Sequence, residues 1–238
     1  PAGVFLLLGP AGTGKTKTVE AIAEMLHGNE KALVRVDCGE FQLEHEVAKL
    51  IGAPPGYLGH RETQPLLTQQ KLTAVTSENS ALSLVLFDEI EKAAPSMTRL
   101  LLGLLDKGTL RLGDNNTVNF ERSLIFFTSN LGARAMGKLL RPDFGFAAGM
   151  TADEPLRLRD RLEKIGINAV RRKFPPEFVN RVDAVVTYQA LDRESLSAIL
   201  DSQLEQLQQH LDRRLGLRSF ELLVSPGAKR VLLKAGTS

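Results

Sequence analysis

Residues 9–16 constrain the fold of this chain more than any other stretch. They read Gly-Pro-Ala-Gly-Thr-Gly-Lys-Thr, which matches the phosphate-binding pattern G-x-x-x-x-G-K-[ST]. The glycines are needed because backbone N–H groups must close around phosphate oxygens in a turn that side chains would block. In such a loop Lys15 would supply positive charge to the outer phosphates and Thr16 a hydroxyl for Mg²⁺.

The sequence around this loop supports the same interpretation. An apolar run at residues 4–8 precedes the loop, and Val19, Ile22, Ala23 and Leu26 follow it at helical spacing. A buried strand before the loop and a helix after it are the context in which the pattern binds nucleotide. The alternative is a glycine-rich turn without a ligand. We predict ATP or ADP with Mg²⁺ as cofactors, held by Gly9, Pro10, Ala11, Gly12, Thr13, Gly14, Lys15, Thr16 and Lys17.

Composition indicates an ordinary globular protein and argues against membrane insertion. The 238 residues are 43% hydrophobic and 24% charged, which is typical of a globular domain, and no apolar run is long enough to cross a bilayer. A net charge of +2 does not by itself imply a nucleic-acid partner. Cys38, the single cysteine, cannot form an internal disulfide, so we predict a reducing, cytoplasmic location.

The order of apolar segments predicts an α/β fold with a parallel sheet flanked by helices. We expect strands at residues 32–37, 84–87, 123–128 and 185–188, in addition to 4–8, and a hairpin at 107–120. Helical patterns occur at residues 41–51, 64–77, 94–106 and 156–173.

Two carboxylates follow the apolar run at residues 84–87. Because parallel strands end at one edge of a sheet, Asp88 and Glu89 should lie beside the phosphate loop. Asp88 can then hold Mg²⁺, together with Thr16, and Glu89 can polarise the water that attacks the terminal phosphate. The alternative is that the two acids begin a helix and complement its dipole.

Asn130 follows the strand predicted at residues 123–128 and should lie at the same edge. Its amide could orient a water by donating and accepting hydrogen bonds at once, or it could cap the following helix. Tyr57 stands in a loop rich in glycine and proline, where it could be a small core anchor or a contact residue. Arg181 could simply pair with Asp183.

A second module begins near Asp192, a candidate N-cap for a long helix. We predict a strand at residues 220–224 and a helix at 226–234. The predicted domains are a nucleotide-binding core at residues 1–190 and, at 191–238, the start of a small α-rich lid. We expect this lid to continue past residue 238, within a longer protein.

Five motifs in this order resemble the AAA+ ATPase module of the Clp protein unfoldases and disaggregases, which is a P-loop NTPase fold. They are residues 9–16, 52–59, 86–93, 128–132 and 176–183. Residues 60–65 depart from the acidic, glycine-rich segment that usually follows the second motif in this family.

The resemblance implies roles that the residues alone leave open. Gly56, Tyr57, Leu58 and Gly59 would form the pore loop of a hexameric ring, a homo-oligomer, and grip unfolded or aggregated protein substrate. Arg181 would be the arginine finger, which reaches the nucleotide of the neighbouring subunit. Asn130 would be the sensor that positions water, and Ile199 would pack near the adenine. Residues 144–146 (Phe-Gly-Phe) stand near the position where protease-linked members of the family carry a docking loop for a peptidase partner, and a disordered loop with two phenylalanines is the alternative.

Two other functions remain compatible with these motifs. One is an AAA+ ATPase that remodels nucleic-acid complexes, against which the low net charge and the Tyr57 loop argue. The other is a nucleotide-dependent assembly switch with little turnover, against which the intact Asp88-Glu89 pair argues.

Overall fold

The computed structural model describes residues 1–52, 65–140, 154–218 and 220–236. They divide into two compact units, Pro1–Gln189 and Ala190–Ser238. No helix among these described residues is long and apolar enough to cross a membrane.

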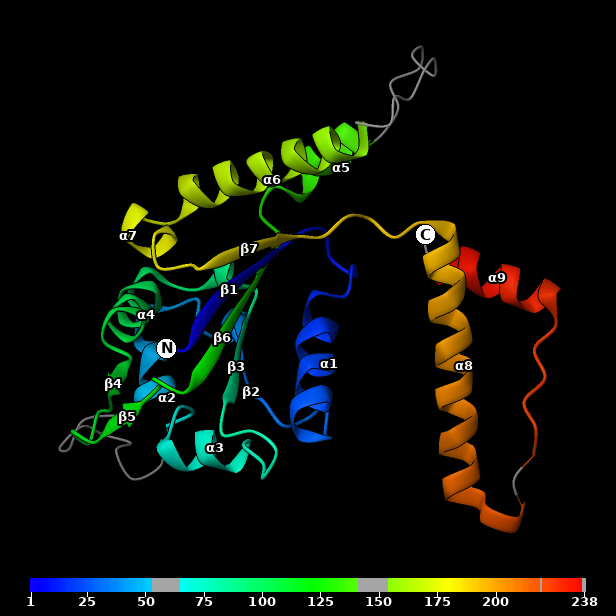
Figure 1. The fold of residues 1–238 in the computed structure, drawn as a ribbon, viewed down its shortest axis with the longest axis horizontal. Coiled ribbons are helices and arrows are strands. Elements are labelled where there is room, and N and C mark those ends of the chain that lie inside the picture. The colour runs from blue at the N-terminus through cyan, green and yellow to red at the C-terminus, as the bar shows by residue number, and fades with distance from the viewer. Residues whose placement is uncertain (53–64, 141–153, 219, 237–238) are drawn as a thin grey trace. The chain divides into compact units, whose positions relative to one another are not determined.

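The first unit is built on a five-stranded sheet in the order β2-β3-β6-β1-β7, and every pair in it is parallel. Figure 1 shows this sheet at the centre of the unit. Its strands are β1 (Gly3–Leu8), β2 (Val34–Asp37), β3 (Ser83–Asp88), β6 (Ser123–Ser129) and β7 (Ala184–Thr187). The predicted parallel sheet with flanking helices is therefore confirmed.

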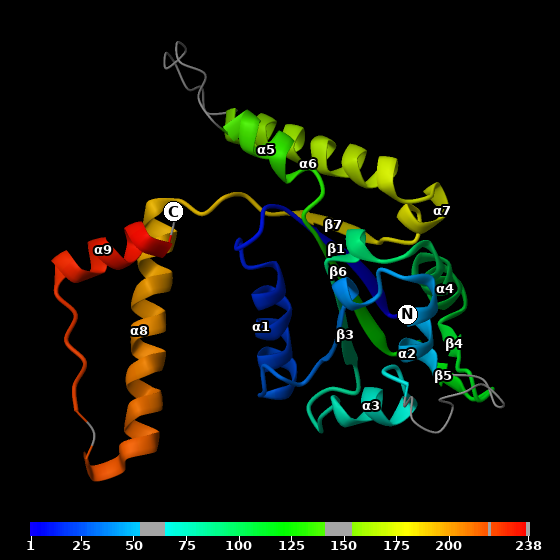
Figure 2. The ribbon, with the colours of Figure 1, turned by 180° about the vertical axis from the view of Figure 1, so that it is seen from behind.

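Apolar side chains on both faces of the sheet bury its central strands β1, β3 and β6, as expected for a parallel sheet. On one face, Leu7 and Leu86 pack against Val19 and Ala23 of helix α1 (Lys15–His27). The opposite face packs against helices that include α4 (Pro95–Lys107) and α6 (Glu154–Lys173). Both views of the ribbon show α1 and α4 on opposite sides of the sheet (Figures 1 and 2).

The remaining elements of this unit are short. The helices are α2 (Val47–Ile51), α3 (Gln69–Ala74), α5 (Ala133–Leu140) and α7 (Pro176–Val179), and single 3₁₀ turns occupy Cys38–Glu40, Glu44–Glu46 and Ile90–Lys92. Strands β4 (Thr109–Arg111) and β5 (Thr117–Asn119) form the predicted hairpin.

Two helices are shorter than the sequence predicts. The helix expected at residues 41–51 is α2 preceded by a 3₁₀ turn, because the Glu46 carboxylate accepts the N–H of Leu43 and holds Leu43 extended (φ −105°, ψ 146°). The helix expected at 64–77 begins only at Gln69, where the Thr68 hydroxyl accepts from the N–H of Lys71 as an N-cap.

The second unit contains α8 (Arg193–Leu215), a 3₁₀ turn (Gly216–Arg218) and α9 (Pro226–Gly236). The predicted N-cap is confirmed, since the Asp192 carboxylate accepts from the N–H of Ser195 at 2.7 Å. The predicted strand at 220–224 is wrong. The side-chain amide of Gln208 bonds to the carbonyl of Phe220 and the N–H of Leu222, so a helix side chain satisfies groups that a neighbouring strand would otherwise pair.

Candidate functional site

The carboxyl ends of three adjacent strands, β3, β6 and β1, place the predicted site residues at one edge of the sheet. Leu8 of β1 lies opposite Ser129 of β6, and Phe87 of β3 lies opposite Phe127 of β6. The chain segments that follow these strands surround a cavity of about 550 Å³. Its lining comes from the phosphate loop and the strand ends: Ala11, Gly12, Gly14, Lys15, Thr16, Lys17, Glu20, Arg35, Asp37, Asp88, Glu89, Thr128 and Asn130.

The phosphate loop depends on glycine at particular points. Gly12 and Gly14 have φ angles of 75° and 90°, a left-handed conformation that residues with a Cβ rarely adopt. At Gly9 a Cβ would lie 2.6 Å from the carbonyl oxygen of Tyr188. Gly14 is the N-cap of α1, so the loop leads directly to the positive end of a helix, where backbone N–H groups favour an anion.

Lys15 is buried inside this loop. Its ammonium donates to the carbonyl oxygens of Gly9 and Pro10 and to Oδ1 of Asn130, each at 2.8 Å. Burial lowers the pKa of Lys15, and the negative charges of Glu91, Asp88 and Glu89 act in the opposite direction. The cation is thus held at the loop by groups that carry no formal charge.

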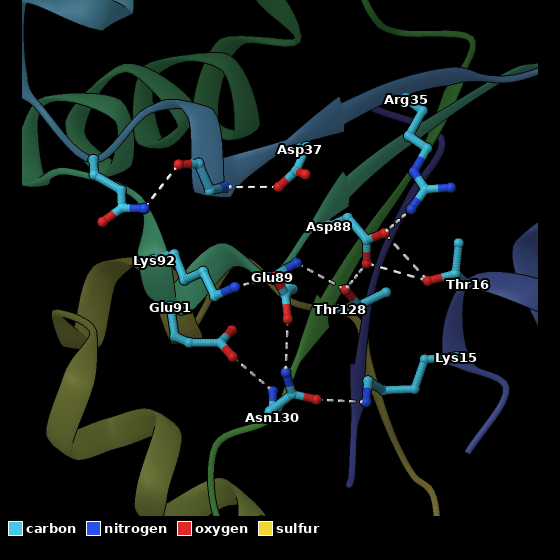
Figure 3. A network of polar contacts seen from close by, with 12 residues as sticks. Lys15, Thr16, Arg35, Asp37, Asp88, Glu89, Glu91, Lys92, Thr128 and Asn130 are labelled. Atoms are coloured by element: carbon cyan, nitrogen blue, oxygen red, sulfur yellow. Dashed lines mark hydrogen bonds and ion pairs between the residues drawn. The ribbon is translucent and has the colours of Figure 1, made fainter. Parts of the chain in front are cut away.

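Asp88 accepts hydrogen bonds from three side chains. The Thr16 hydroxyl lies 3.2 and 3.3 Å from its two oxygens, the Thr128 hydroxyl lies 2.5 Å from Oδ1, and the Arg35 guanidinium lies 2.5 Å from Oδ2 (Figure 3). Hydroxyl and carboxylate oxygens are the ligands that Mg²⁺ prefers. The described residues contain no group of three His, Cys, Asp or Glu side chains that could hold a metal.

Glu89 has a left-handed backbone (φ 55°, ψ 51°), which turns its side chain away from the strand. Its N–H donates to the Thr128 hydroxyl at 2.9 Å. The carboxylate accepts from Nδ2 of Asn130 at 3.1 Å and from the ammonium of Lys92 at 2.5 Å. Glu89 stands at the N-cap position of a 3₁₀ turn, and its side chain makes no capping hydrogen bond there.

Asn130 connects the phosphate loop to the acidic pair. Its amide oxygen accepts from Lys15 and its amide nitrogen donates to Glu89, while its backbone N–H donates to Glu91 at 3.0 Å (Figure 3). The amide thus accepts a hydrogen bond from Lys15 and donates one to Glu89. These contacts favour the site role over side-chain capping of the following helix.

The other candidate residues lie in different surroundings. Lys17 lines the cavity, but its ammonium pairs with Glu30 at 2.6 Å and Glu20 at 2.9 Å, and these bonds raise its pKa. Ile199 lies on α8 in the second unit and is 44% exposed. The pore-loop residues 56–59 and the candidate docking residues 144–146 lie outside the described residues.

Arg181 pairs with Asp106 of α4. The alternative that Arg181 pairs with Asp183 is wrong, because the Asp183 carboxylate accepts from the N–H of Val4 at 2.8 Å and so ties the start of β7 to β1. Arg181 is not among the residues that line the cavity.

Sequence reasoning missed several contributors to the site. Arg35 and Thr128 contact Asp88 directly, Glu91 holds the backbone of Asn130, and Lys92 pairs with Glu89. A signal existed for Arg35: β2 alternates buried and exposed residues, so Arg35 and Asp37 share a face at the edge where Asp88 ends its strand.

Comparison with known proteins agrees with this geometry. A family model described as the AAA domain (Cdc48 subfamily) matches residues 1–185. The chain belongs to this AAA domain family. The predicted likeness to the Clp ATPase module is also confirmed, since the chain is 39% identical over 99% of its length to the chaperone protein ClpB of Corynebacterium diphtheriae. It is 38% identical over 90% of its length to ClpB of Mycoplasma genitalium.

Solved structures of Hsp104 resemble the chain as well. A Saccharomyces cerevisiae Hsp104:casein complex matches it with a TM-score of 0.77 and 29% identity, over 100% of this chain and 37% of that chain. An S. cerevisiae Hsp104-ADP complex matches with a TM-score of 0.75 and 29% identity, over 98% of this chain and 37% of that chain. The chain spans about a quarter of the ClpB relatives, 23% of one and 26% of the other.

Proposed function

We propose that this AAA domain binds ATP with Mg²⁺ and hydrolyses it at the cavity beside the phosphate loop. One observation carries the proposal: Lys15, the Thr16–Asp88 pair and the Asn130–Glu89 pair all line the same cavity. The residues present fit both cofactors, since the glycine loop leads into the N-terminus of α1 for phosphate, and Thr16 and Asp88 offer hard oxygens for Mg²⁺.

Each residue would have a distinct part in hydrolysis. Lys15 would neutralise the outer phosphates, and Asn130 would orient the attacking water. Glu89 would take a proton from that water as its oxygen bonds to the terminal phosphorus and the bond to the bridging oxygen of ADP breaks. When bound at Thr16 and Asp88, Mg²⁺ would supply positive charge to the phosphate oxygens.

Assembly would complete the site. We assign Arg181 as the residue that reaches the nucleotide of a neighbouring copy in a hexameric ring. Its guanidinium would neutralise charge in the transition state, so that hydrolysis depends on the ring. The pair with Asp106 is about half exposed on both sides, and such pairs contribute little to stability, so Arg181 can leave it at low cost.

The substrate we propose is unfolded or aggregated protein, threaded through the ring by Gly56, Tyr57, Leu58 and Gly59. The likeness to ClpB chaperones, and to Hsp104 in complex with casein, supports this choice over a nucleic-acid substrate. We further propose that residues 1–190 form the nucleotide core, that 191–238 belong to a small lid whose Ile199 packs near the adenine, and that the protein is cytoplasmic.

The decisive experiment measures nucleotide binding and phosphate release by the assembled full-length protein. Glu89→Gln removes the base but keeps the shape of the side chain and its acceptor oxygen for Asn130. We expect ATP binding to persist and turnover to fall by about 10²–10⁴-fold, the usual contribution of general base catalysis.

Glu78→Gln is the matched control, because Glu78 is exposed and does not line the cavity. This substitution should leave ATP binding and turnover unchanged. Undiminished turnover in Glu89→Gln rings would contradict the assignment of the base. If the wild-type protein bound no nucleotide, the proposed function itself would be wrong.

A further inference from the structure

We propose that Arg35 competes with the divalent cation for Asp88 and so sets the metal affinity of the nucleotide site. This inference rests on the proposed function and assigns regulation to the same cavity. The observation behind it is a direct ion pair between a cation of the chain and the carboxylate that would hold Mg²⁺ (Figure 3).

The backbone places Arg35 for this contact. Val34 and Val36 of β2 are buried, so Arg35 is directed to the other side of the strand, toward the cavity that it lines. In the parallel pairing of β2 and β3, Arg35 lies opposite Leu86, two residues before Asp88. Its guanidinium consequently reaches forward along the sheet edge to Oδ2 of Asp88 at 2.5 Å.

The three hydrogen-bond donors to Asp88 differ in charge and therefore in their effect on metal binding at this carboxylate. The hydroxyls of Thr16 and Thr128 are neutral and are compatible with a cation at the same carboxylate. The guanidinium carries a full positive charge, which would repel a dication bound within a few ångströms. Arg35 must therefore move away from Asp88 when Mg²⁺ binds, or remain there and weaken its binding.

Lys15 does not have the same effect on Asp88. Its ammonium donates to Gly9, Pro10 and Asn130, so among the described hydrogen bonds the charged donor to Asp88 is Arg35. The Asp88 side chain is 12% exposed, whereas that of Arg35 is 52% exposed. A half-exposed arginine can be displaced, and solvent reduces the strength of its charge, so we expect a modest effect.

The test measures the affinity of Mn²⁺, a paramagnetic substitute for Mg²⁺, for the complex of the full-length protein with ADP. Electron paramagnetic resonance reports free Mn²⁺ directly and needs no turnover. We expect Arg35→Gln to bind Mn²⁺ about three- to tenfold more tightly than wild type, because the competing charge is gone. Arg35→Lys keeps the charge and should remain close to wild type.

Two further variants separate the effect of the Arg35 charge from that of its apolar side chain and from that of losing a positive charge elsewhere. Arg35→Met keeps the apolar part of the side chain and should tighten Mn²⁺ binding as Arg35→Gln does. Arg99→Gln removes the same charge on α4, where the guanidinium faces Glu44 at 3.5 Å outside the cavity, and should leave Mn²⁺ affinity unchanged.

The proposed competition would be wrong if Arg35→Gln bound Mn²⁺ with the same or a lower affinity than the wild type. It would also be wrong if Arg35→Lys raised the Mn²⁺ affinity as much as Arg35→Gln does. These results differ from a failure of the proposed function, in which the wild-type protein would bind neither ADP nor Mn²⁺. If the wild-type protein binds ADP and Mn²⁺ but the affinity for Mn²⁺ does not change when the Arg35 charge is removed, the inference is wrong and the proposed nucleotide site is unaffected.

Discussion

At the scale of single residues, Glu89 shows how the chain holds an unfavourable backbone conformation at the candidate site. A left-handed backbone is uncommon for a residue other than glycine, and such residues persist where neighbouring contacts fix them. Here the N–H bonds to Thr128 and the carboxylate bonds to Asn130 and Lys92. The conformation directs the carboxylate toward the cavity instead of continuing β3.

Gly9 provides a prediction at the same scale. Its φ of 156° is a conformation that residues with a Cβ rarely adopt. In addition, the backbone and Cβ of Tyr188 lie too close to leave space for a Cβ at this position. We expect Gly9→Ala to lower the free energy of unfolding by about 1–3 kcal/mol, the usual cost of overpacking, and to weaken nucleotide binding. Denaturant unfolding and nucleotide titration measure the two effects.

The matched control is Gly103→Ala, at an exposed position of α4 where a Cβ would meet nothing within 4 Å. In the interior of a helix alanine is more stable than glycine. This change should therefore raise the free energy of unfolding by about 0.5–1 kcal/mol. Equal effects of the two substitutions would show that the contact with Tyr188 does not limit position 9.

At the scale of elements, helix ends are decided by side chains that satisfy backbone groups. Thr68 begins α3 and Asp192 begins α8 in this way. Gln208 acts similarly from the middle of α8, where it binds the backbone of Phe220 and Leu222 and replaces the strand that the sequence predicted. Side-chain hydrogen bonds therefore set the boundaries of several elements.

The cap of α8 should respond to pH. The backbone N–H of Ser195 stabilises the Asp192 carboxylate and lowers its pKa. A lowered pKa in the folded state means that the cap contributes its full stability above the ordinary pKa of aspartate. This stability is lost as pH falls through the lowered value. Protection of the first turn of α8 from hydrogen exchange should therefore weaken at acidic pH.

Two substitutions check this account of the cap. Asp192→Ala should reduce protection at neutral pH, because the N–H of Ser195 loses its acceptor. Asp192→Asn keeps an acceptor without the charge, so its protection should be nearly independent of pH in the acidic range. Acid sensitivity of Asp192→Asn equal to that of wild type would place the titrating group elsewhere.

At the scale of the whole molecule, the proposed activity joins a nucleotide site to a polypeptide channel. The first unit contains the site, and the residues expected to grip substrate come after α2 and before α3 in the sequence. Hydrolysis in this scheme needs Arg181 from a neighbouring copy, whereas threading needs the Tyr57 loop. The two activities should therefore be separable by mutation.

Tyr57→Ala should abolish threading and spare hydrolysis. An aromatic side chain can hold varied polypeptide side chains without reading their sequence, and alanine cannot. The measurement is the unfolding of a fluorescent substrate by assembled full-length protein, alongside phosphate release. Tyr57→Phe keeps the ring and should restore unfolding. A Tyr57→Ala protein that still unfolds its substrate would refute the pore-loop role.

The sequence alone determined the parallel sheet, the phosphate loop and the convergence of Lys15, Asp88 and Asn130, because these follow from local patterns and from the rule that parallel strands end at one edge. Only the tertiary structure decided which charged side chains form ion pairs. Arg35 reaches Asp88 across 53 positions of the chain, and Arg181 pairs with Asp106 instead of its near neighbour Asp183. Long charged side chains can reach many partners, and only the packing of strands and helices selects among them.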